Sequence, residues 1–526
     1  MPQELKTKVE IYDTTLRDGA QSEGINFSVS DKIKIIKLLD SLGVDYIEAG
    51  WPGANPVDAE IFKEITSLRL KNSKIAAFGC TKKPEIAPED DKVLNMLLSA
   101  ESEIVAIFGK TWDFHVTEAL CTTLPENLNM IYESIAYLKS KGKRVFFDAE
   151  HFFDGYKHNP EYALKAIKTA AEAGAERIIL CDTNGGCINT EIYKITKKVN
   201  ETIPDVKIGI HAHNDCDMAV ANSIAAVEAG AVQVQGTING CGERCGNANL
   251  CSIIPNLQVK KDYDVIGDNI KKLVYVTNSF AEIANIAVNA NSPFVGRSAF
   301  AHKAGVHASG VAKNSETYEH VAPEIFGNAR KILISDQAGS ASIREKIEQL
   351  RFIDSIDESD IPKIIDRIKK LEWKGFAFEG AEASFELLVM DILGLKKEYF
   401  KLLGYRIIGD TIAGAGINTE ASVKLQVNDN IIHTVSEGDG PVNALDRAFR
   451  KALKDVYPQI HLYKLNDFKV RILDSTDGTA AQVRVMIETT DGFNKWDTVG
   501  VSQNIIEASY MAIIDSIVYG LVLHQA

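Results

Sequence analysis

Two histidines, His211 and His213, stand two residues apart in the segment KIGIHAHND. If this segment is a β-strand, alternation directs both imidazoles to the same face. Asp18 in DTTLRDG and Asn247 in NGCGERCGN could add a carboxylate oxygen and an amide oxygen. This mixed set suits a divalent ion that keeps positions open for a substrate, whether Mg²⁺, Mn²⁺, Co²⁺ or Zn²⁺. The alternative is a hydrogen-bonded strand end that binds no metal.

Three further residues could act on a 2-keto acid, which an open divalent ion can chelate and polarise. Arg17 could stabilise an alkoxide that develops on the keto carbonyl, or it could pair structurally with Asp13 or Asp18. Thr183 could donate to the substrate carboxylate, or it could cap a strand. Glu150 could take part in proton transfer, or it could be a surface or supporting carboxylate.

A last group of titratable residues lies in SAFAHKAGVHASGVAKNSETYEHV, residues 298–321. It contains His302, Lys303, His307 and Tyr318 among small residues. Such a segment suits closure over a site, and it could equally be an ordinary loop.

Short apolar runs alternate with amphipathic stretches through the first half of the chain. The eight runs are residues 9–15, 46–52, 74–80, 104–110, 144–150, 177–183, 207–213 and 232–238. Each is rich in Val, Ile and Phe, as buried parallel strands are. Helices are expected at 31–43 after a Ser30 cap, at 159–175 and at 217–231. Eight such units predict a (β/α)8 TIM barrel, with an open doubly wound sheet as the alternative.

The barrel prediction explains why the candidate residues matter together. In a TIM barrel the active site gathers at the carboxyl ends of the strands, and each candidate before residue 250 follows or ends one of the predicted strands. Residues 1–275 are therefore expected to form a TIM-barrel catalytic domain.

The rest of the chain changes character twice. Residues 276–395 are mostly helical in pattern and more charged, as in the segment 343–375, and are expected to form helical connector subdomains. Residues 396–526 contain two similar stretches, 434–453 and 497–517, each following alternating strand patterns. We interpret this as an α+β pseudo-symmetric module for regulation or dimerisation, with chance similarity as the alternative.

Composition excludes some classes of partner. The 526 residues have a formal net charge of −14, which argues against nucleic acid or an anionic membrane surface. No stretch is expected to span a membrane, and the first residues do not resemble a signal peptide. All eight cysteines lie between Cys80 and Cys251 without zinc-finger spacing, so reduced thiols and a cytoplasmic location are expected.

Four motifs in chain order, DTTLRDGAQ, HAHND, NGCGERCGN and HKAGVH, resemble the DRE-TIM metallolyase family, which includes isopropylmalate, homocitrate and citramalate synthases. The resemblance implies that Asp18, His211, His213 and Asn247 bind the metal. It also implies a carbonyl-polarising role for Arg17 and a carboxylate-binding role for Thr183. Catalytic roles follow for Glu150, His307 and Tyr318, although FFDAEHFFDGY departs from the usual pattern around Glu150. The C-terminal module resembles the amino-acid-sensing domain of these synthases, and a homodimer is implied.

Three segments, IEAGWPGANPVDAEIF, TKKPEIAPEDDKVLNMLL and VAIFGKTWDFHVTEALCTTLPENL, resemble a bacterial citramalate synthase branch of this family. That branch implies acetyl-CoA and pyruvate as substrates and isoleucine as a feedback effector. The effector carboxylate could meet a helix N-terminus near Gly438–Pro441 or Gly500–Ser502. The alternatives are an isopropylmalate or homocitrate synthase, an acyl-CoA lyase, and a non-catalytic amino-acid sensor.

Overall fold

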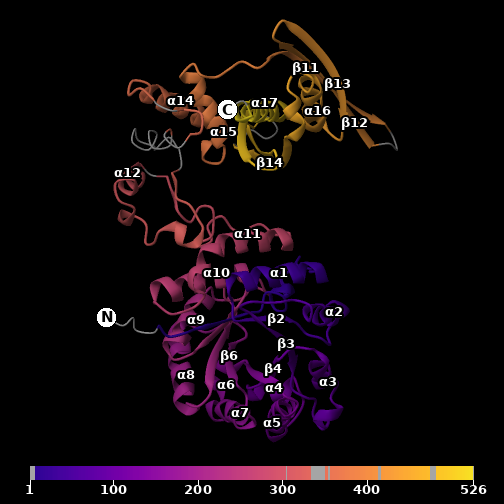
Figure 1. Ribbon diagram of the computed structural model, residues 1–526, viewed down its shortest axis with the longest axis vertical. Helices are drawn as coiled ribbons and strands as arrows, with labels where there is room; N and C mark the ends of the chain where they lie inside the picture. Colours follow the sequence, from indigo (N-terminus) through magenta and orange to yellow (C-terminus); the bar gives the residue numbers. More distant parts are fainter. Residues whose placement is uncertain are drawn as a thin grey trace. The chain divides into compact units, whose positions relative to one another are not determined.

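Eight parallel strands in the first half of the chain close into a barrel in the computed structural model (Figure 1). They are β1 (Glu10–Asp13), β2 (Tyr46–Gly50), β3 (Lys74–Cys80), β4 (Ile104–Lys110), β5 (Arg144–Glu150), β6 (Arg177–Asp182), β7 (Lys207–Ala212) and β8 (Gln233–Gly236). Each strand lies within one of the predicted apolar runs. The barrel closes because β8 pairs with β1, so the TIM barrel is confirmed and the open sheet is wrong.

The structure describes residues 6–303, 305–332, 347, 350–353, 356–412, 416–473 and 481–524. The chain divides into two compact units. Unit 1 comprises residues 1–300 and 322–329, and unit 2 comprises residues 301–321 and 330–526. Each unit is described by itself.

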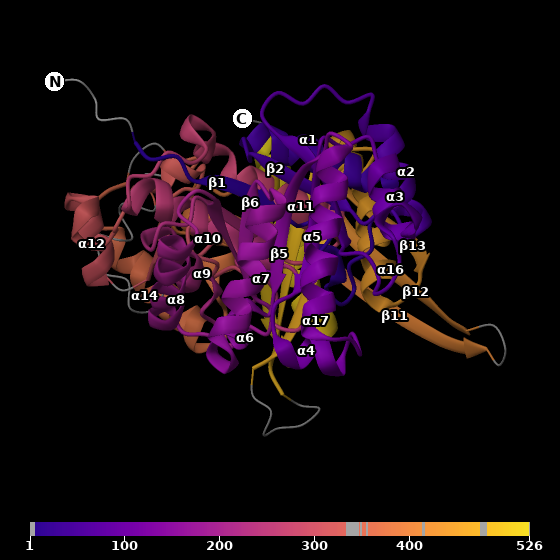
Figure 2. The ribbon, with the colours of Figure 1, turned by 90° about the horizontal axis from the view of Figure 1, so that it is seen from below.

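Helices cover the outside of the barrel strands in unit 1 (Figure 1 and Figure 2). The longer ones are α1 (Val29–Leu42), α2 (Pro56–Ile65), α3 (Lys92–Ser99), α5 (Leu124–Ser140), α7 (Pro160–Ala173), α8 (Asn189–Thr202), α9 (Ala219–Glu228) and α11 (Leu273–Ala284). Three shorter helices, α4 (Asp113–Glu118), α6 (Phe152–His158) and α10 (Leu250–Pro255), follow β4, β5 and β8.

Local capping sets the ends of α1, and one detail differs from the sequence expectation. The cap is Ser28 rather than Ser30, because the Ser28 hydroxyl accepts from the Asp31 N–H while the Asp31 carboxylate accepts from the Ser28 N–H. This reciprocal capping box satisfies two N–H groups that the first helical turn leaves unpaired. Gly43, with φ of 89°, ends the helix in the left-handed conformation.

Aromatic side chains fill the barrel interior. Tyr12, Tyr46 and Phe146 belong to one buried cluster, and the Tyr46 and Phe146 rings meet edge to face at 5.3 Å. The barrel is therefore a packed core rather than a pore.

Unit 2 contains two copies of one arrangement, as the internal repeat predicts. The first copy is the antiparallel sheet β11 (Lys401–Ile412), β12 (Gly416–Val427) and β13 (Asn430–Gly438) followed by α16 (Pro441–Leu453). The second copy is the antiparallel sheet β14 (Lys464–Ile472), β15 (Val483–Thr490) and β16 (Lys495–Ser502) followed by α17 (Ile505–Leu523). Before them come α12 (Gly305–Lys313), α14 (Ile361–Trp373) and α15 (Glu382–Ile392). Most of the predicted helical residues 343–349 lie outside the described residues.

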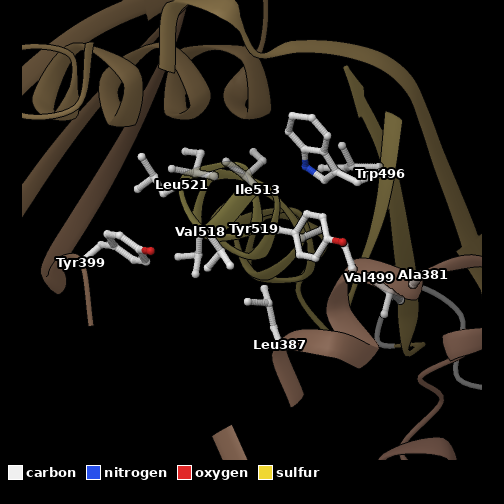
Figure 3. Close-up of a cluster of buried hydrophobic side chains, with 14 of the residues drawn as sticks. Ala381, Leu387, Tyr399, Trp496, Val499, Ile513, Val518, Tyr519 and Leu521 are labelled. Atoms are coloured by element: carbon white, nitrogen blue, oxygen red, sulfur yellow. The ribbon is translucent and has the colours of Figure 1, made fainter. Parts of the chain in front are cut away.

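Helix α17 corrects one expectation from composition. It is long and apolar enough to cross a membrane, since an 18-residue window has a mean hydropathy of 1.6, whereas the sequence analysis expects no such stretch. In the structure 61% of that window is buried. Figure 3 shows Ile513, Val518 and Leu521 of this helix in a cluster with Leu387 of α15 and Trp496 of β16. The apolar length of α17 is thus explained by its place in the core of unit 2.

Gly500 of β16 allows the second sheet to approach its helix, because a Cβ there would lie 2.0 Å from the backbone oxygen of Ala508 in α17. We expect Gly500→Ala to lower the free energy of unfolding by about 1–3 kcal/mol through overpacking. The measurement is urea unfolding followed by circular dichroism. Gly440→Ala is the control, since its Cβ would meet nothing within 4 Å, and equal stability of the two variants would contradict this close-packing explanation.

Candidate active site

Three of the predicted metal ligands meet at the carboxyl end of the barrel. Asp18 comes from the loop after β1, and His211 and His213 come from the end of β7. The Nε2 atom of His211 lies 3.2 Å from Asp18 Oδ2 and 3.3 Å from His213 Nε2, and His213 Nε2 lies 3.9 Å from the same carboxylate oxygen. All three residues are buried. The strand alternation that the sequence predicts therefore directs both imidazoles toward one carboxylate.

This arrangement fits a bound cation. One carboxylate oxygen and two ring nitrogens face one another within 4.8 Å, and neutral imidazoles would place three electron pairs there without a proton between them. Asn247 is brought alongside by a backbone bridge to His213. Its Nδ2 donates to the Cys241 carbonyl at 3.2 Å, while its buried Oδ1 has no hydrogen-bond partner among the described residues. An oxygen-binding divalent ion would satisfy that orphan acceptor.

The electrostatics of the three groups differ although they are neighbours. Burial would raise the pKa of Asp18, but the Arg17 cation and the His211 hydrogen bond outweigh burial and hold that pKa well below its usual value. Burial and, as a smaller effect, the neighbouring His211 together lower the pKa of His213 to about 4. For His211 burial is outweighed by the bond to Asp18, so its pKa is raised. The site thus keeps Asp18 ionised and His213 neutral, which is the ligand state that metal binding requires.

Arg17 is held by a partner that the sequence analysis missed. Its Nε donates to Glu48 Oε1 at 2.5 Å, its Nη1 lies 3.5 Å from Asp18, and its guanidinium stacks 3.8 Å from the centroid of the Phe78 ring. The Tyr12 hydroxyl donates to the other oxygen of Glu48 at 2.7 Å. The pairing of Arg17 with Asp18 is observed.

The predicted alternative of an Arg17–Asp13 pair is wrong, because the carboxylate of Asp13 accepts from the backbone N–H and the hydroxyl of Thr15. Glu48 could have been recognised in the sequence as the partner of Arg17. It is a lone carboxylate inside an otherwise apolar strand, and a carboxylate rarely lies fully buried without a partner.

Glu150 and Thr183 lie at the ends of neighbouring strands and line the same cavity. Glu150 forms an ion pair with Lys110, which stands opposite it at the end of β4 and which the sequence analysis did not single out. Thr183 Oγ1 accepts from the backbone N–H of His151 at 2.8 Å. That bond leaves the hydroxyl proton of Thr183 available to a ligand, such as a carboxylate.

The cavity has a volume of about 280 Å³ and two chemically different walls. Arg17, Asp18, Glu150, His211 and His213 are among its polar lining residues. Trp51, Phe78 and Phe108 form an aromatic wall, with ring centroids 5.6–6.0 Å apart. The cavity can therefore hold a small anion whose apolar end faces the rings.

Arg244 connects the loops that follow β6, β7 and β8 at the edge of the cavity. Its guanidinium makes two bonds to Asp215, at 2.7 and 3.0 Å, and one to the Thr183 carbonyl at 2.9 Å. Residues after β6, β7 and β8 are thereby tied together. Arg244 belongs to the motif NGCGERCGN, but its partners become visible only in the structure.

His307 and Tyr318 belong to unit 2, whereas the other predicted site residues belong to unit 1. Their rings stack with centroids 4.2 Å apart, and both side chains are exposed. His302, from the same predicted cluster, instead bonds Glu319, which also pairs with Arg330. The catalytic roles of His307 and Tyr318 stay predictions, and the exposure of their stacked rings leaves them accessible to a ligand.

Comparisons with known proteins show which families the chain matches. A profile of the HMGL-like family matches residues 8–287, one of the homocitrate synthase post-HMGL domain matches 294–375, and one of the LeuA allosteric (dimerisation) domain matches 379–521. The chain is 54% identical to an (R)-citramalate synthase of Aquifex aeolicus over 98% of both chains. It is 50% identical to an (R)-citramalate synthase of Geobacter sulfurreducens over 98% of this chain and 97% of that one. A 2-isopropylmalate synthase of Methanocaldococcus jannaschii is 34% identical over 97% of this chain and 94% of its own.

We expect Asp18→Asn to weaken Mn²⁺ binding by about 10²-fold or more, because the ionised ligand contributes the site's negative charge and losing a ligand costs more than losing an outer partner. Chelator competition on the full-length protein measures the affinity. The control is Asp262→Asn, an exposed carboxylate paired with Lys6. Unchanged Mn²⁺ affinity in the Asp18 variant would remove Asp18 from the ligand set.

Proposed function

Because this chain belongs to the (R)-citramalate synthases of the DRE-TIM metallolyase family, we propose that it is a transferase that condenses acetyl-CoA with pyruvate and hydrolyses the resulting thioester to (R)-citramalate and CoA. The observation that carries the proposal is the convergence of Asp18, His211 and His213 with Arg17 and Glu150 around one small cavity. Whole-length similarity to citramalate synthases supports the choice of substrate.

Asp18, His211, His213 and Asn247 would hold a divalent metal, whether Mg²⁺, Mn²⁺, Co²⁺ or Zn²⁺. When bound, the ion supplies Lewis-acid polarisation of the keto carbonyl. The four residues would supply two ring nitrogens, one carboxylate oxygen and one amide oxygen, and all four residues are buried.

Arg17 and Thr183 position the keto acid. Arg17 is fixed by Glu48 and by the Phe78 ring, so its cation is pre-organised beside the carbonyl oxygen that becomes negative on attack. Thr183 keeps its hydroxyl proton for the substrate carboxylate because its lone pair already accepts from His151.

Glu150 and His307 are the candidate residues for proton transfer, and Tyr318 stacks on His307. We propose Glu150 or His307 as the base that takes one methyl proton from acetyl-CoA, and the enolate forms a carbon–carbon bond to the keto carbon. The carbonyl electron pair moves to oxygen, which is then protonated to the tertiary alcohol. Water adds to the thioester carbonyl and the thiolate of CoA leaves. Lys110 holds Glu150 at the strand end through its ion pair.

The aromatic wall accounts for a preference for pyruvate over larger 2-keto acids. If the keto-acid side chain faces Trp51, Phe78 and Phe108, the rings leave room for a methyl group. A larger branched side chain would collide with these rings, which pack against one another.

A panel of 2-keto acids with acetyl-CoA, followed by release of free thiol, tests this proposal. We expect pyruvate to have the highest kcat/KM. We expect Phe108→Ala to shift the preference toward 2-oxobutanoate by about 10–100-fold, because a pocket discriminates about 1–3 kcal/mol per methylene. The control is Phe114→Ala, a half-exposed ring outside the cavity lining.

Two other outcomes would replace the proposal. Faster thiol release with 2-oxoisovalerate or 2-oxoglutarate than with pyruvate would indicate an isopropylmalate or homocitrate synthase. Isoleucine binding without thiol release from any keto acid would indicate a non-catalytic sensor.

Regulation by isoleucine is part of the proposal, since residues 379–521 match the LeuA allosteric domain. Of the two helix N-termini considered, α16 suits a ligand carboxylate better. Its first residue follows Gly440, and no side chain caps it. The first turn of α17 is capped by Asn504, whose Oδ1 accepts from the Ile506 N–H at 2.9 Å. We place the effector carboxylate near Gly438–Pro441 for this reason.

We expect Gly440→Asp to weaken inhibition by isoleucine by about 10-fold, because an acidic cap at α16 competes with the carboxylate of the effector. The measurement is thiol release as a function of isoleucine concentration. Gly440→Ala should retain wild-type inhibition, since its backbone is extended and its Cβ meets nothing within 4 Å. Wild-type inhibition of the Asp variant would exclude this helix end.

The remaining proposals concern organisation. We propose a catalytic domain at 1–275, helical connector subdomains at 276–395 and a regulatory domain at 396–526, assembled as a homodimer through the last. A cytoplasmic location, without nucleic acid or a membrane as partner, accords with the net charge of −14. The eight cysteines are free thiols, as reduced surroundings would leave them.

A further inference from the structure

Gln235 lies in the barrel interior directly beneath the candidate metal ligands. It is on β8, fully buried, and in register with Tyr12 of β1 and His211 of β7. Its amide makes two hydrogen bonds. The Nδ1 of His211 lies 2.9 Å from Gln235 Oε1, and Gln235 Nε2 lies 3.3 Å from Asp148 Oδ1.

The direction of the Gln235 amide follows from its neighbour. The NH₂ group of Gln235 donates to Asp148, so its carbonyl oxygen faces the Nδ1 atom of His211. A carbonyl oxygen can only accept in turn. Gln235 therefore holds a proton on the Nδ1 atom of His211, so the neutral imidazole would present its Nε2 lone pair to a metal ion.

The opposite ring nitrogen of His211 points to the candidate metal position. Its Nε2 faces Asp18 Oδ2 at 3.2 Å and His213 Nε2 at 3.3 Å, which is where the ligand atoms converge. His213 differs, because its buried Nδ1 has no hydrogen-bond partner among the described residues. Among the described residues, a side chain therefore orients the His211 imidazole through its Nδ1 atom, and none does so for His213.

We propose that Gln235, itself held by Asp148, is a positioning residue that fixes the tautomer and ring orientation of His211 and so sets the affinity of this site for a divalent cation. The inference rests on the metal-binding part of the proposed function and does not depend on which keto acid is the substrate. Outer partners of this kind change metal affinity by about 10–100-fold.

The barrel offers a matched control two residues earlier on the same strand. Gln233 is also fully buried, but it pairs in register with Glu10 at the amino end of β1 and donates to the Glu10 carboxylate at 3.3 Å. Gln233→Leu and Gln235→Leu make the same chemical change in the same barrel. They differ in whether the lost amide faces the candidate metal ligands.

The experiment is Mn²⁺ affinity of the full-length protein at one fixed pH, measured by chelator competition, with thermal melting of the metal-free protein as a check on folding. We expect Gln235→Leu to weaken Mn²⁺ binding by about 10–100-fold. We expect Gln233→Leu to leave it within about two-fold. Gln235→Glu retains an acceptor oxygen for the Nδ1 proton of His211, so it should bind Mn²⁺ far more tightly than the Leu variant.

Each outcome decides between explanations. Wild-type affinity in a folded Gln235→Leu variant would overturn the proposal, and so would equal losses in the Glu and Leu variants, because the acceptor oxygen would then be irrelevant. If Gln235→Leu does not fold, the comparison of Gln235→Glu with Gln233→Leu still tests the proposal, since the Glu variant should match the control. Absence of Mn²⁺ binding by the wild-type protein would instead count against the metal site of the proposed function.

Discussion

The carboxylate of Asp18 carries its charge where it has almost no contact with water, and the catalytic end of the barrel is arranged around it. The Arg17 cation offsets that charge, and Arg17 is itself buried and requires Glu48. Glu48 lies fully inside the barrel and is satisfied by Arg17 on one oxygen and the Tyr12 hydroxyl on the other. An alternating series of buried charges is stable only when each member has its partner, because removing one leaves an uncompensated charge in a low-dielectric interior. The position of Arg17 is thus set by the same series that keeps Asp18 ionised.

The closed barrel brings Asp18 to the two histidines. Asp18 follows β1 and His211 lies on β7, and they meet because β8 pairs with both of these strands. The loop after β8 carries Asn247 back to the site, and Gly242 permits the close approach of that side chain. A Cβ on Gly242 would lie 2.1 Å from Asn247 Nδ2, so the loop could not hold that amide beside His213 with a larger residue there. Strand pairing and one close backbone approach together bring the ligand candidates within reach of one ion.

Unit 2 is stabilised mainly by apolar packing of sheets on helices. Its two sheets each cover one helix, and α17 is apolar nearly all round because β15, β16 and α15 all pack on it. Buried polar groups there are paired locally, as where Tyr519 of α17 donates to Glu386 of α15 at 2.8 Å. Two similar sheet-and-helix units in one core are suited to transmitting a ligand's effect by small shifts of packed elements, which accords with a regulatory role for this part of the chain.

Much of the fold and the ligand set could be predicted from the sequence because these features depend on local periodicity. Eight β-rich runs, separated by helical patterns, determined the barrel, and alternation within β7 placed His211 and His213 on one face. The repeat in the last third determined two copies of one sheet-and-helix unit. The partners of these residues were decided by tertiary structure: Glu48 for Arg17, Lys110 for Glu150 and Gln235 for His211. Each partner lies on a strand next to the strand that carries or precedes the residue it contacts. Which residues face each other across strands depends on strand register and barrel closure, and no local sequence pattern contains that information.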